Sequence, residues 1–301
     1  APAYSEIMFG AWHAGLATVP MNARLHPREF AYILQNSGAR ICFVSEDMAD
    51  EIVQAAQDVP TLEHIVIAES PRYRELAGAD PIEVVDVDPD ALAWLFYTSG
   101  TTGRSKGAML SHRNLVSNAT VLTVHWQITA SDRLIHALPI FHTHGLFVAM
   151  NTSLIAGASI RFMERFDIDL ILSELPRSTM LMGVPTFYTR LLGDARFTQE
   201  LCAGMRLFVS GSAPLLAETH SAFEDRTGQL ILERYGMTET NMITSNPFDG
   251  ARVAGTVGFP LAGTQVVITA NATPVAQVDI GVIEVKGDNV FQGYWNMPDK
   301  T

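Results

Sequence analysis

The sequence predicts an α/β protein with two layered strand–helix regions and a smaller β-rich region at the end. Short apolar runs typical of buried strands alternate with helical patterns over most of the chain, which indicates parallel α/β layers. After about residue 246 the helical patterns stop, and the last apolar stretches alternate with polar residues as antiparallel strands do. We therefore expect three regions, at 1–90, 91–245 and 246–301.

The first region combines helices with short strands. Phe30, Ile33 and Leu34 recur at the spacing that places them on one face of a helix. Residues 69–90 contain three prolines and several acids and read as a surface connection. We expect helices at 7–15, 27–36 and 48–57 and strands at 40–44 and 65–67.

The second region repeats the alternation more regularly, and the third contains strands alone. In the second we expect strands at 92–97, 134–138, 159–163, 179–182 and 207–210, and helices at 114–123, 145–155, 168–175, 186–192 and 215–227. In the third we expect strands at 266–268 and 281–286.

The composition fits a globular enzyme better than other classes. The chain has 301 residues, of which 48% are hydrophobic and 17% charged, and its formal net charge is −12. This argues against disorder and against a general nucleic-acid binder, which is more often basic. Cys42 and Cys202 lie among apolar residues and read as buried free thiols in a reducing compartment. No apolar run reaches the roughly 18–20 residues of a membrane span, so we expect a cytoplasmic protein, or a mitochondrial one if it is eukaryotic.

A loop rich in Gly, Thr and Ser directly follows the strand expected at 92–97. It runs Tyr97-Thr98-Ser99-Gly100-Thr101-Thr102-Gly103-Arg104-Ser105-Lys106-Gly107. Its three glycines let the backbone approach a ligand, and its hydroxyls, backbone N–H groups and single lysine suit a polyphosphate. The spacing matches neither the Walker A loop nor the dinucleotide-binding Gly-x-Gly-x-x-Gly pattern. Its place inside a regular α/β run also argues against a flexible linker.

This loop resembles the ATP-binding signature of the adenylate-forming superfamily, which comprises acyl-CoA synthetases, luciferases and peptide-synthetase adenylation domains. Many members have Pro before the lysine, whereas this chain has Ser105, which removes one fixed φ angle. Three further segments resemble the family's substrate-pocket segment, the turn beside its adenine and its nucleotide signature, in the family's order: Pro139 to Gly145, Ser210 to Leu215 and Glu233 to Thr240. Each segment alone is a weak signal, but their joint order and spacing are specific.

The resemblance covers essentially the whole chain and implies a fold and a set of small-molecule partners. The fold is that of the family's large N-terminal domain, α/β with two layered βα subdomains and the start of a small β-barrel-like subdomain. The partners are ATP, Mg²⁺, coenzyme A and a carboxylic acid. The family also uses an Asp that binds the ribose and a Lys on a small C-terminal domain, both further along the chain. We therefore expect a chain truncated at both ends, with weak or no turnover by itself.

The resemblance also implies roles for single residues. Lys106, Thr238 and Glu239 are expected to carry catalysis, with Thr238 at the α-phosphate and Tyr235 near the adenine. Glu239 is expected to hold Mg²⁺, which prefers hard oxygen ligands shared with phosphates. Catalysis of the first step is then mainly positioning and charge neutralisation. The expected ATP-binding residues are Thr98, Ser99, Gly100, Thr101, Thr102, Gly103, Lys106, Ser212, Ala213, Pro214, Glu233, Tyr235, Gly236, Met237 and Thr238.

The acyl pocket is expected to be polar rather than an apolar tunnel. Arg190 and Arg234 offer two guanidinium groups, which suit a second carboxylate on the substrate. The string from Glu233 to Asn246 looks closest to malonyl-CoA synthetases, which are similar in using two arginines and a serine for that carboxylate. The expected substrate-binding residues are His144, Arg190, Ser212 and Arg234.

Several functions stay open at this point. The expected reaction is ATP-dependent activation of malonate, or methylmalonate, through an acyl-AMP to the CoA thioester. An acyl- or aryl-CoA synthetase for an uncharged acid would require the arginines to face elsewhere. A peptide-synthetase adenylation domain would need an acidic residue for the amino group, and the pocket segments offer no clear candidate. A non-catalytic nucleotide-binding module is the alternative from another class of protein.

Overall fold

The chain folds into two compact units, which are described separately. The computed structural model describes residues 2–98, 104–270, 273–275 and 279–301. Unit 1 comprises Ala1–His112 together with Phe291–Thr301, and unit 2 comprises Arg113–Val290. The expected subdomain limits at residues 90 and 245 stay predictions about finer divisions of the chain.

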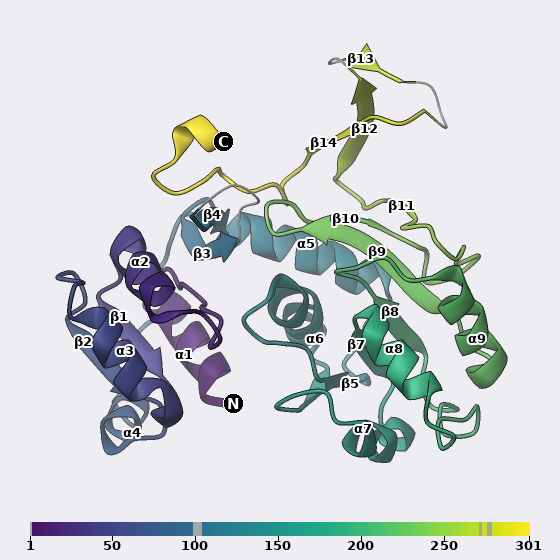
Figure 1. Cartoon of the computed structure of the whole chain (residues 1–301), viewed down its shortest axis with the longest axis horizontal. Helices are drawn as coiled ribbons and strands as arrows, with labels where there is room; N and C mark the ends of the chain where they lie inside the picture. The colour runs from purple at the N-terminus through teal and green to yellow at the C-terminus, as the bar shows by residue number, and fades with distance from the viewer. Residues whose placement is uncertain (1, 99–103, 271–272, 276–278) are drawn as a thin grey trace. The chain divides into compact units, whose positions relative to one another are not determined.

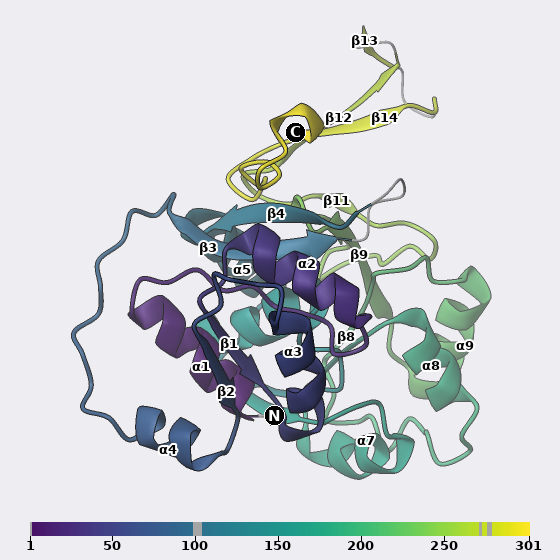
Figure 2. The ribbon, with the colours of Figure 1, turned by 60° about the vertical axis from the view of Figure 1, so that its left-hand side comes forward.

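Unit 1 contains two small sheets with helices around them. Its elements are α1 (Pro2–His13), α2 (Pro27–Ser37), β1 (Ile41–Val44), the 3-10 helix η1 (Glu46–Met48), α3 (Ala49–Ala56), β2 (His64–Ile67), α4 (Pro71–Ala77), β3 (Leu92–Thr98), β4 (Lys106–Ser111) and the 3-10 helix η4 (Pro298–Lys300). β1 and β2 pair in parallel. Phe30 and Leu34 of α2 form one core cluster with Val44 of β1 and Ile52 of α3. Figure 2 shows α2, α3 and β1 in the same part of unit 1.

Local sequence determines where α2 begins and ends. The His26 ring accepts the Arg28 N–H at 3.2 Å, while Glu29 accepts the His26 N–H at 3.0 Å, so the first orphan donors of the helix are satisfied. Pro27 suits the first helical position because its φ is already helical. Gly38 ends the helix in the left-handed region at φ 68°, which glycine adopts without a steric penalty.

Apart from the short 3-10 helices, one helix and one strand described in unit 1 were not expected from the sequence. Residues 71–77 form α4 inside the predicted surface connection, because Ser70 caps it by accepting the Tyr73 N–H and Pro71 starts it. β4 follows the phosphate loop and pairs antiparallel with β3, with Lys106 opposite Thr98. The prediction placed no strand there, because the short run after Lys106 shows no clear alternation.

Unit 2 is built on a seven-stranded sheet in the order β11-β10-β9-β8-β7-β5-β6. The parallel strands are β5 (Arg133–His136), β6 (Ser159–Phe162), β7 (Met180–Gly183), β8 (Leu207–Ser210) and β9 (Ile231–Met237), and the antiparallel ones are β10 (Asn241–Ser245) and β11 (Phe259–Pro260). The parallel core confirms the predicted α/β class. The β9–β10 hairpin was not expected, because Gly236 and the polar residues after it read as a turn.

The helices of unit 2 accompany this sheet (Figure 1). They are α5 (His112–His125), α6 (Thr152–Ala156), α7 (Ile168–Glu174), the 3-10 helix η3 (Leu175–Arg177), α8 (Pro185–Leu192) and α9 (Ala217–Thr227). The helix expected at 145–155 is instead a π-helix, η2 (His144–Asn151), that continues into α6. Among the described residues, no helix combines the length and apolar character that crossing a bilayer requires.

The β-rich end of unit 2 is an antiparallel sheet of β12 (Gln265–Ala270), β13 (Thr273–Pro274) and β14 (Val282–Lys286). The predicted antiparallel strands are therefore confirmed. Within the described ranges this sheet, at the place of the predicted start of a β-barrel-like subdomain, stays open. The reason is geometric, since three strands cannot close a hydrogen-bonded ring around a core.

Candidate functional site

Arg234 lies in β9, and its guanidinium is buried in unit 2. The side chain is only 4% exposed, and within the described residues neither Nε nor Nη2 has a hydrogen-bond partner. Glu233, the preceding residue, belongs to the other face of the strand, where its Oε1 accepts the Gly255 N–H at 3.0 Å. Glu233 therefore does not neutralise Arg234. A buried cation without a counter-charge is unfavourable, so this position favours an anionic ligand.

Gly211 provides the space that the guanidinium occupies. A Cβ atom at Gly211 would lie 2.3 Å from Cζ of Arg234 and 2.5 Å from its Nη1. A Cβ would fit only if the flexible end of Arg234 moved, so glycine here lets the guanidinium keep its position and is not required by an unusual φ angle. Sequence reasoning quoted this residue in a motif but gave it no role, because only the fold brings β8 and β9 side by side.

His144 and Ser212 lie next to each other at the same site. Nδ1 of His144 is 3.3 Å from Oγ of Ser212, while its buried Nε2 has no partner within the described residues. His144 opens the π-helix η2, and such helices often occur at functional sites. The nearby His136 ring holds this turn, with Nε2 2.7 Å from the Gly145 carbonyl oxygen.

The charges in this cluster follow from burial. Loss of hydration lowers the pKa of Arg234 to about 10, which still leaves the guanidinium charged at neutral pH. Burial first, and Arg234 second, hold the pKa of His144 well below its usual value, so this ring is neutral. The site therefore carries one buried positive charge, with a neutral imidazole and a hydroxyl beside it.

The β9–β10 hairpin carries the nucleotide signature at its turn. Gly236 is required for the hairpin, because a Cβ there would lie 2.0 Å from the Asn241 carbonyl oxygen. Tyr235 and Met237 are exposed, and Thr238 and Glu239 are half-buried. Oγ1 of Thr238 is 3.4 Å from Oγ1 of Thr143, which links the turn to the substrate-pocket segment.

The turn between β8 and α9 holds Ser212 in a strained conformation. Ser212 has φ 67°, a left-handed value that is uncommon for residues other than glycine. Ser212, Ala213 and Pro214 are all exposed. The turn thus presents these three residues to solvent, and their role in adenine binding stays a prediction.

Arg190 has a different local environment from Arg234. It is exposed near the end of α8, and its guanidinium stacks 4.0 Å from the centroid of the Phe166 ring. Within the described part of the chain it makes no hydrogen bond or ion pair with Arg234 or Ser212. The predicted use of both arginines for one carboxylate stays a prediction.

Part of the phosphate loop can be described in unit 1. Thr98 ends β3, Lys106 begins β4, and the two lie opposite each other. Nζ of Lys106 sits 4.2 Å from the centroid of the Tyr294 ring, a cation–π distance. The other predicted loop residues, Ser99, Gly100, Thr101, Thr102 and Gly103, lie outside the described residues.

Comparison with known proteins now identifies the class. Residues 1–295 match the family model described as AMP-binding enzyme, and the chain belongs to that family. It is 33% identical to a mitochondrial malonate–CoA ligase of Mus musculus over 99% of this chain and 57% of that protein. The chain thus spans less than two thirds of the length of this relative.

Solved structures give the same result for the fold. An ATP-bound MatB from Rhodopseudomonas palustris superposes with a TM-score of 0.95 and 46% identity, covering all of this chain and 61% of that one. A malonyl-CoA ligase in a product complex with methylmalonyl-CoA and AMP superposes with a TM-score of 0.85 and 36% identity, covering 99% and 63%. The predicted superfamily and its α/β fold are confirmed.

Proposed function

We propose that the full-length protein activates malonate, or its methyl derivative, with ATP and transfers the acyl group to coenzyme A. The observation that carries the proposal is the buried guanidinium of Arg234, whose Nε and Nη2 have no hydrogen-bond partner among the described residues. A carboxylate beside it would gain charge-assisted hydrogen bonds and relieve the cost of the unpaired charge. An acid with a single carboxylate cannot both bind there and react, so the substrate needs two.

Malonate satisfies this requirement with the smallest spacer. One carboxylate would rest on Arg234, near Ser212 and the neutral His144, while the other reacts. An uncharged acid would leave the arginine without a partner, which is the kind of mismatch that polar sites reject strongly. Arg190 is a second candidate for binding the distal carboxylate, and this role rests only on the resemblance to malonyl-CoA synthetases.

The reaction consists of two displacements. The free carboxylate attacks the α-phosphorus of ATP and expels pyrophosphate, which forms the acyl-AMP. The thiol of coenzyme A then attacks the acyl carbon, AMP leaves, and the thiol proton passes to solvent. We propose that Thr98 to Lys106 bind the ATP phosphates and that Thr238 contacts the α-phosphate. Glu239, half-buried at the hairpin turn, suits Mg²⁺, which typically takes one or two carboxylates plus phosphate oxygens.

The comparisons support this reading. Mouse malonate–CoA ligase and the malonyl-CoA ligase product complex bear names with the same diacid, and the MatB structure contains ATP. These names belong to those proteins. They support the proposal for this chain because the positively charged site at Arg234 suits the second carboxylate of such a diacid.

The first test is a panel of acids given to the full-length protein. Pyrophosphate release is measured with ATP, Mg²⁺, coenzyme A and either malonate, methylmalonate, acetate, octanoate or benzoate. We expect release with malonate and little with acetate. Release with octanoate or benzoate instead would be consistent with acid activation by ATP but would overturn the proposal that the substrate is a dicarboxylic acid. No release with any acid would favour the non-catalytic module.

The second test replaces Arg234 by methionine, an apolar side chain of similar length. The loss of charge-assisted hydrogen bonds predicts a fall in kcat/KM for malonate of roughly 10- to 150-fold, with little change in KM for ATP. Because the substitution also removes an unpaired buried charge, the free energy of unfolding of the unliganded protein should not fall. Arg190→Met is the matched comparison, and an equal effect on malonate would give both arginines the same role. A loss of stability in Arg234→Met would instead make that residue structural.

A further inference from the structure

The β9–β10 hairpin has an outer edge that its neighbouring strand does not cover. β11 pairs with β10 only at Thr244 and Ser245. Met242, nearer the turn, lies opposite Gly236 on the inner side. Uncovered backbone groups at a buried edge need other partners.

Side-chain amides supply those partners. Asn118 of α5 donates from Nδ2 to the Met242 carbonyl at 2.8 Å and accepts the Met242 N–H on Oδ1 at 3.1 Å. One side chain thus binds both backbone groups of Met242, as a neighbouring strand would. Asn118 is 5% exposed, so these bonds are shielded from water.

Asn289 continues the pattern toward the turn. Its Nδ2 donates to the Thr240 carbonyl at 2.6 Å, and its own carbonyl accepts from Nδ2 of Asn241 at 3.2 Å. Oγ1 of Thr264 donates to Oδ1 of Asn289 at 3.1 Å, which fixes the orientation of the amide. Asn114 lies one turn before Asn118 on α5. Its Nδ2 donates to the backbone carbonyls of Asp288 and Val290 and so holds the segment that contains Asn289.

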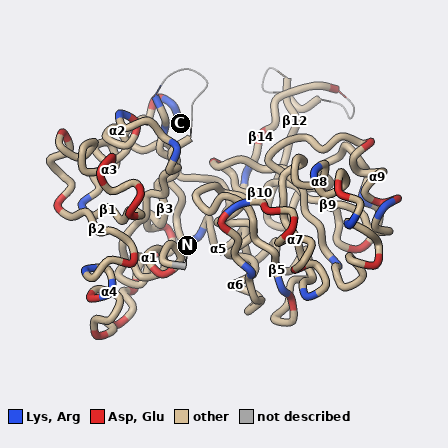
Figure 3. Tube along the Cα trace, turned by 60° about the horizontal axis from the view of Figure 1, so that its bottom comes forward, with Lys and Arg blue, Asp and Glu red and all other residues tan. Residues whose placement is uncertain are grey.

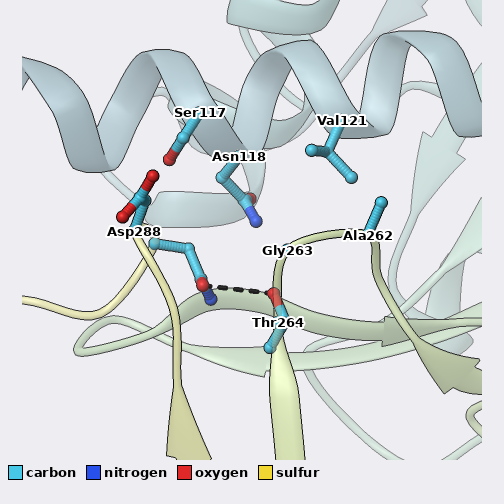
Figure 4. Close-up of a pocket in the computed structure, with 8 residues that line it drawn as sticks. Ser117, Asn118, Val121, Ala262, Gly263, Thr264 and Asp288 are labelled. Carbon is cyan, nitrogen blue, oxygen red and sulfur yellow. Dashed lines mark hydrogen bonds between the residues drawn. The ribbon is translucent and has the colours of Figure 1, made fainter.

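The space behind these amides is only loosely filled. A cavity of about 100 Å³ adjoins Asn118 and Thr264 (Figure 4). Asn289 also lines it. On this side the two amides have few dispersion contacts, so their hydrogen bonds to the hairpin are not supplemented by packing there.

We propose that Asn118 and Asn289 are positioning residues that clamp the hairpin turn carrying Thr238 and Glu239. The clamp binds the backbone at residues 240 and 242, directly after the two side chains assigned to the α-phosphate and Mg²⁺. It holds that turn in place before the nucleotide binds, which lowers the ordering cost of binding. The inference rests on the proposed function, because the roles of Thr238 and Glu239 come from it.

The test uses Asn118→Leu and Asn289→Leu in the full-length protein, because leucine has nearly the shape of asparagine but no amide. Gln229→Met is the control, since Nε2 of Gln229 also donates to two backbone carbonyls, those of Cys202 and Met205, away from the hairpin. We expect kcat/KM for Mg·ATP to fall at least about 10-fold in the Asn variants while KM for malonate changes by less than about threefold. The control should leave both unchanged.

Hydrogen exchange at residues 237–245 of the unliganded protein gives a second readout that needs no activity. We expect exchange at the Asn241 and Met242 amides to accelerate in the Asn variants but not in Gln229→Met. If Asn289→Leu does not fold, Asn289→Asp retains the acceptor for Thr264, loses the donor to Thr240 and adds a negative charge beside that carbonyl.

Unchanged exchange and unchanged Mg·ATP kinetics in a folded variant would overturn the clamp, as would an equal loss for Mg·ATP and malonate. If the unmodified protein releases no pyrophosphate with any acid, the proposed function fails instead. Calorimetric titration of the Asn variants with Mg·ATP then tests the clamp separately. Weaker binding of Mg·ATP together with faster hydrogen exchange in the turn would support it, and no change in either would overturn it.

Discussion

At the scale of single residues, the candidate site contains groups that a stable core would avoid. Among the residues that the structure describes, Nε and Nη2 of Arg234 and Nε2 of His144 are buried without a hydrogen-bond partner, and Ser212 adopts a left-handed φ angle. Each of these is unfavourable in the unliganded protein. Such departures from good packing and pairing are expected where a protein binds a ligand rather than where it stabilises itself.

Gly211→Ala tests the close approach of Gly211 and Arg234. The new Cβ would lie 2.3 Å from Cζ of Arg234, so the end of the flexible arginine must move. We expect the fold to persist and kcat/KM for malonate to fall about 10-fold or more, since a displaced guanidinium loses its hydrogen bonds. Steady-state kinetics with malonate and ATP varied separately measure this.

Gly204→Ala is the matched control for that variant. A Cβ at Gly204 would meet no atom closer than the Ser178 carbonyl oxygen at 3.7 Å, an ordinary contact. It should leave malonate kinetics unchanged. If kcat/KM for malonate is unchanged in Gly211→Ala, the position of the Arg234 guanidinium does not matter for malonate binding.

At the scale of elements, one buried carboxylate ties together the beginnings of three parallel strands. Asp132 precedes β5, Thr179 precedes β7 and Arg206 precedes β8. Oδ1 of Asp132 accepts from Thr179 Oγ1 and from Arg206 Nε, each at 2.7 Å. Burial alone would raise the pKa of Asp132, but its hydrogen bonds, led by that from Arg206, outweigh burial and lower the pKa to about 2.

Asp132→Asn should therefore destabilise unit 2 in a pH-dependent way. Because the folded pKa lies below the unfolded one, the contribution of Asp132 is fully present above about pH 4 and is lost as the pH falls through about 2. We expect a loss of about 2–4 kcal/mol at pH 7, from the broken ion pair with Arg206. Urea unfolding at pH 7, 5, 4 and 3 measures the difference, which should shrink only at the acidic end. A constant difference at every pH would contradict the assignment.

At the scale of the whole molecule, the chain leaves unit 1 and returns to it. The Met109 N–H donates to the Gly293 carbonyl at 2.9 Å, and the Trp295 N–H donates to the Gly107 carbonyl at 2.8 Å, so residues 291–295 extend the β3–β4 sheet. The ring of Tyr294 thereby comes to lie against Lys106. Acidic and basic positions are intermingled along the described part of both units (Figure 3), and the net charge of −12 does not favour a general nucleic-acid partner.

Removing residues 291–301 should affect unit 1 and spare unit 2. Without the added strand, the Met109 amide loses its acceptor, so its hydrogen exchange should accelerate at least about 10-fold. The amides of Leu181 and Met182 in the buried strand β7 should exchange as before. Hydrogen exchange on residues 1–301 and 1–290 compares the two. Faster exchange in β7 would mean that the units unfold together.

The sequence by itself determined the elements whose signals are local. The limits of α2 follow from His26, Pro27 and Gly38, and the buried parallel strands follow from apolar runs such as 180–182. The family follows from motif order, because the loop and the three later segments need particular residues at fixed spacings. Helix α4 was missed although Ser70 and Pro71 form a recognisable start.

Only the tertiary structure decided which residues meet. The sequence predicted Arg190 and Arg234 for the same carboxylate, but one is exposed on Phe166 and the other is buried against Gly211. The amides of Asn118 and Asn289 reach one hairpin from 171 residues apart, counted as 289 minus 118. Local patterns report on neighbours within a few residues along the chain, whereas burial and unpaired charge depend on contacts between distant strands and helices.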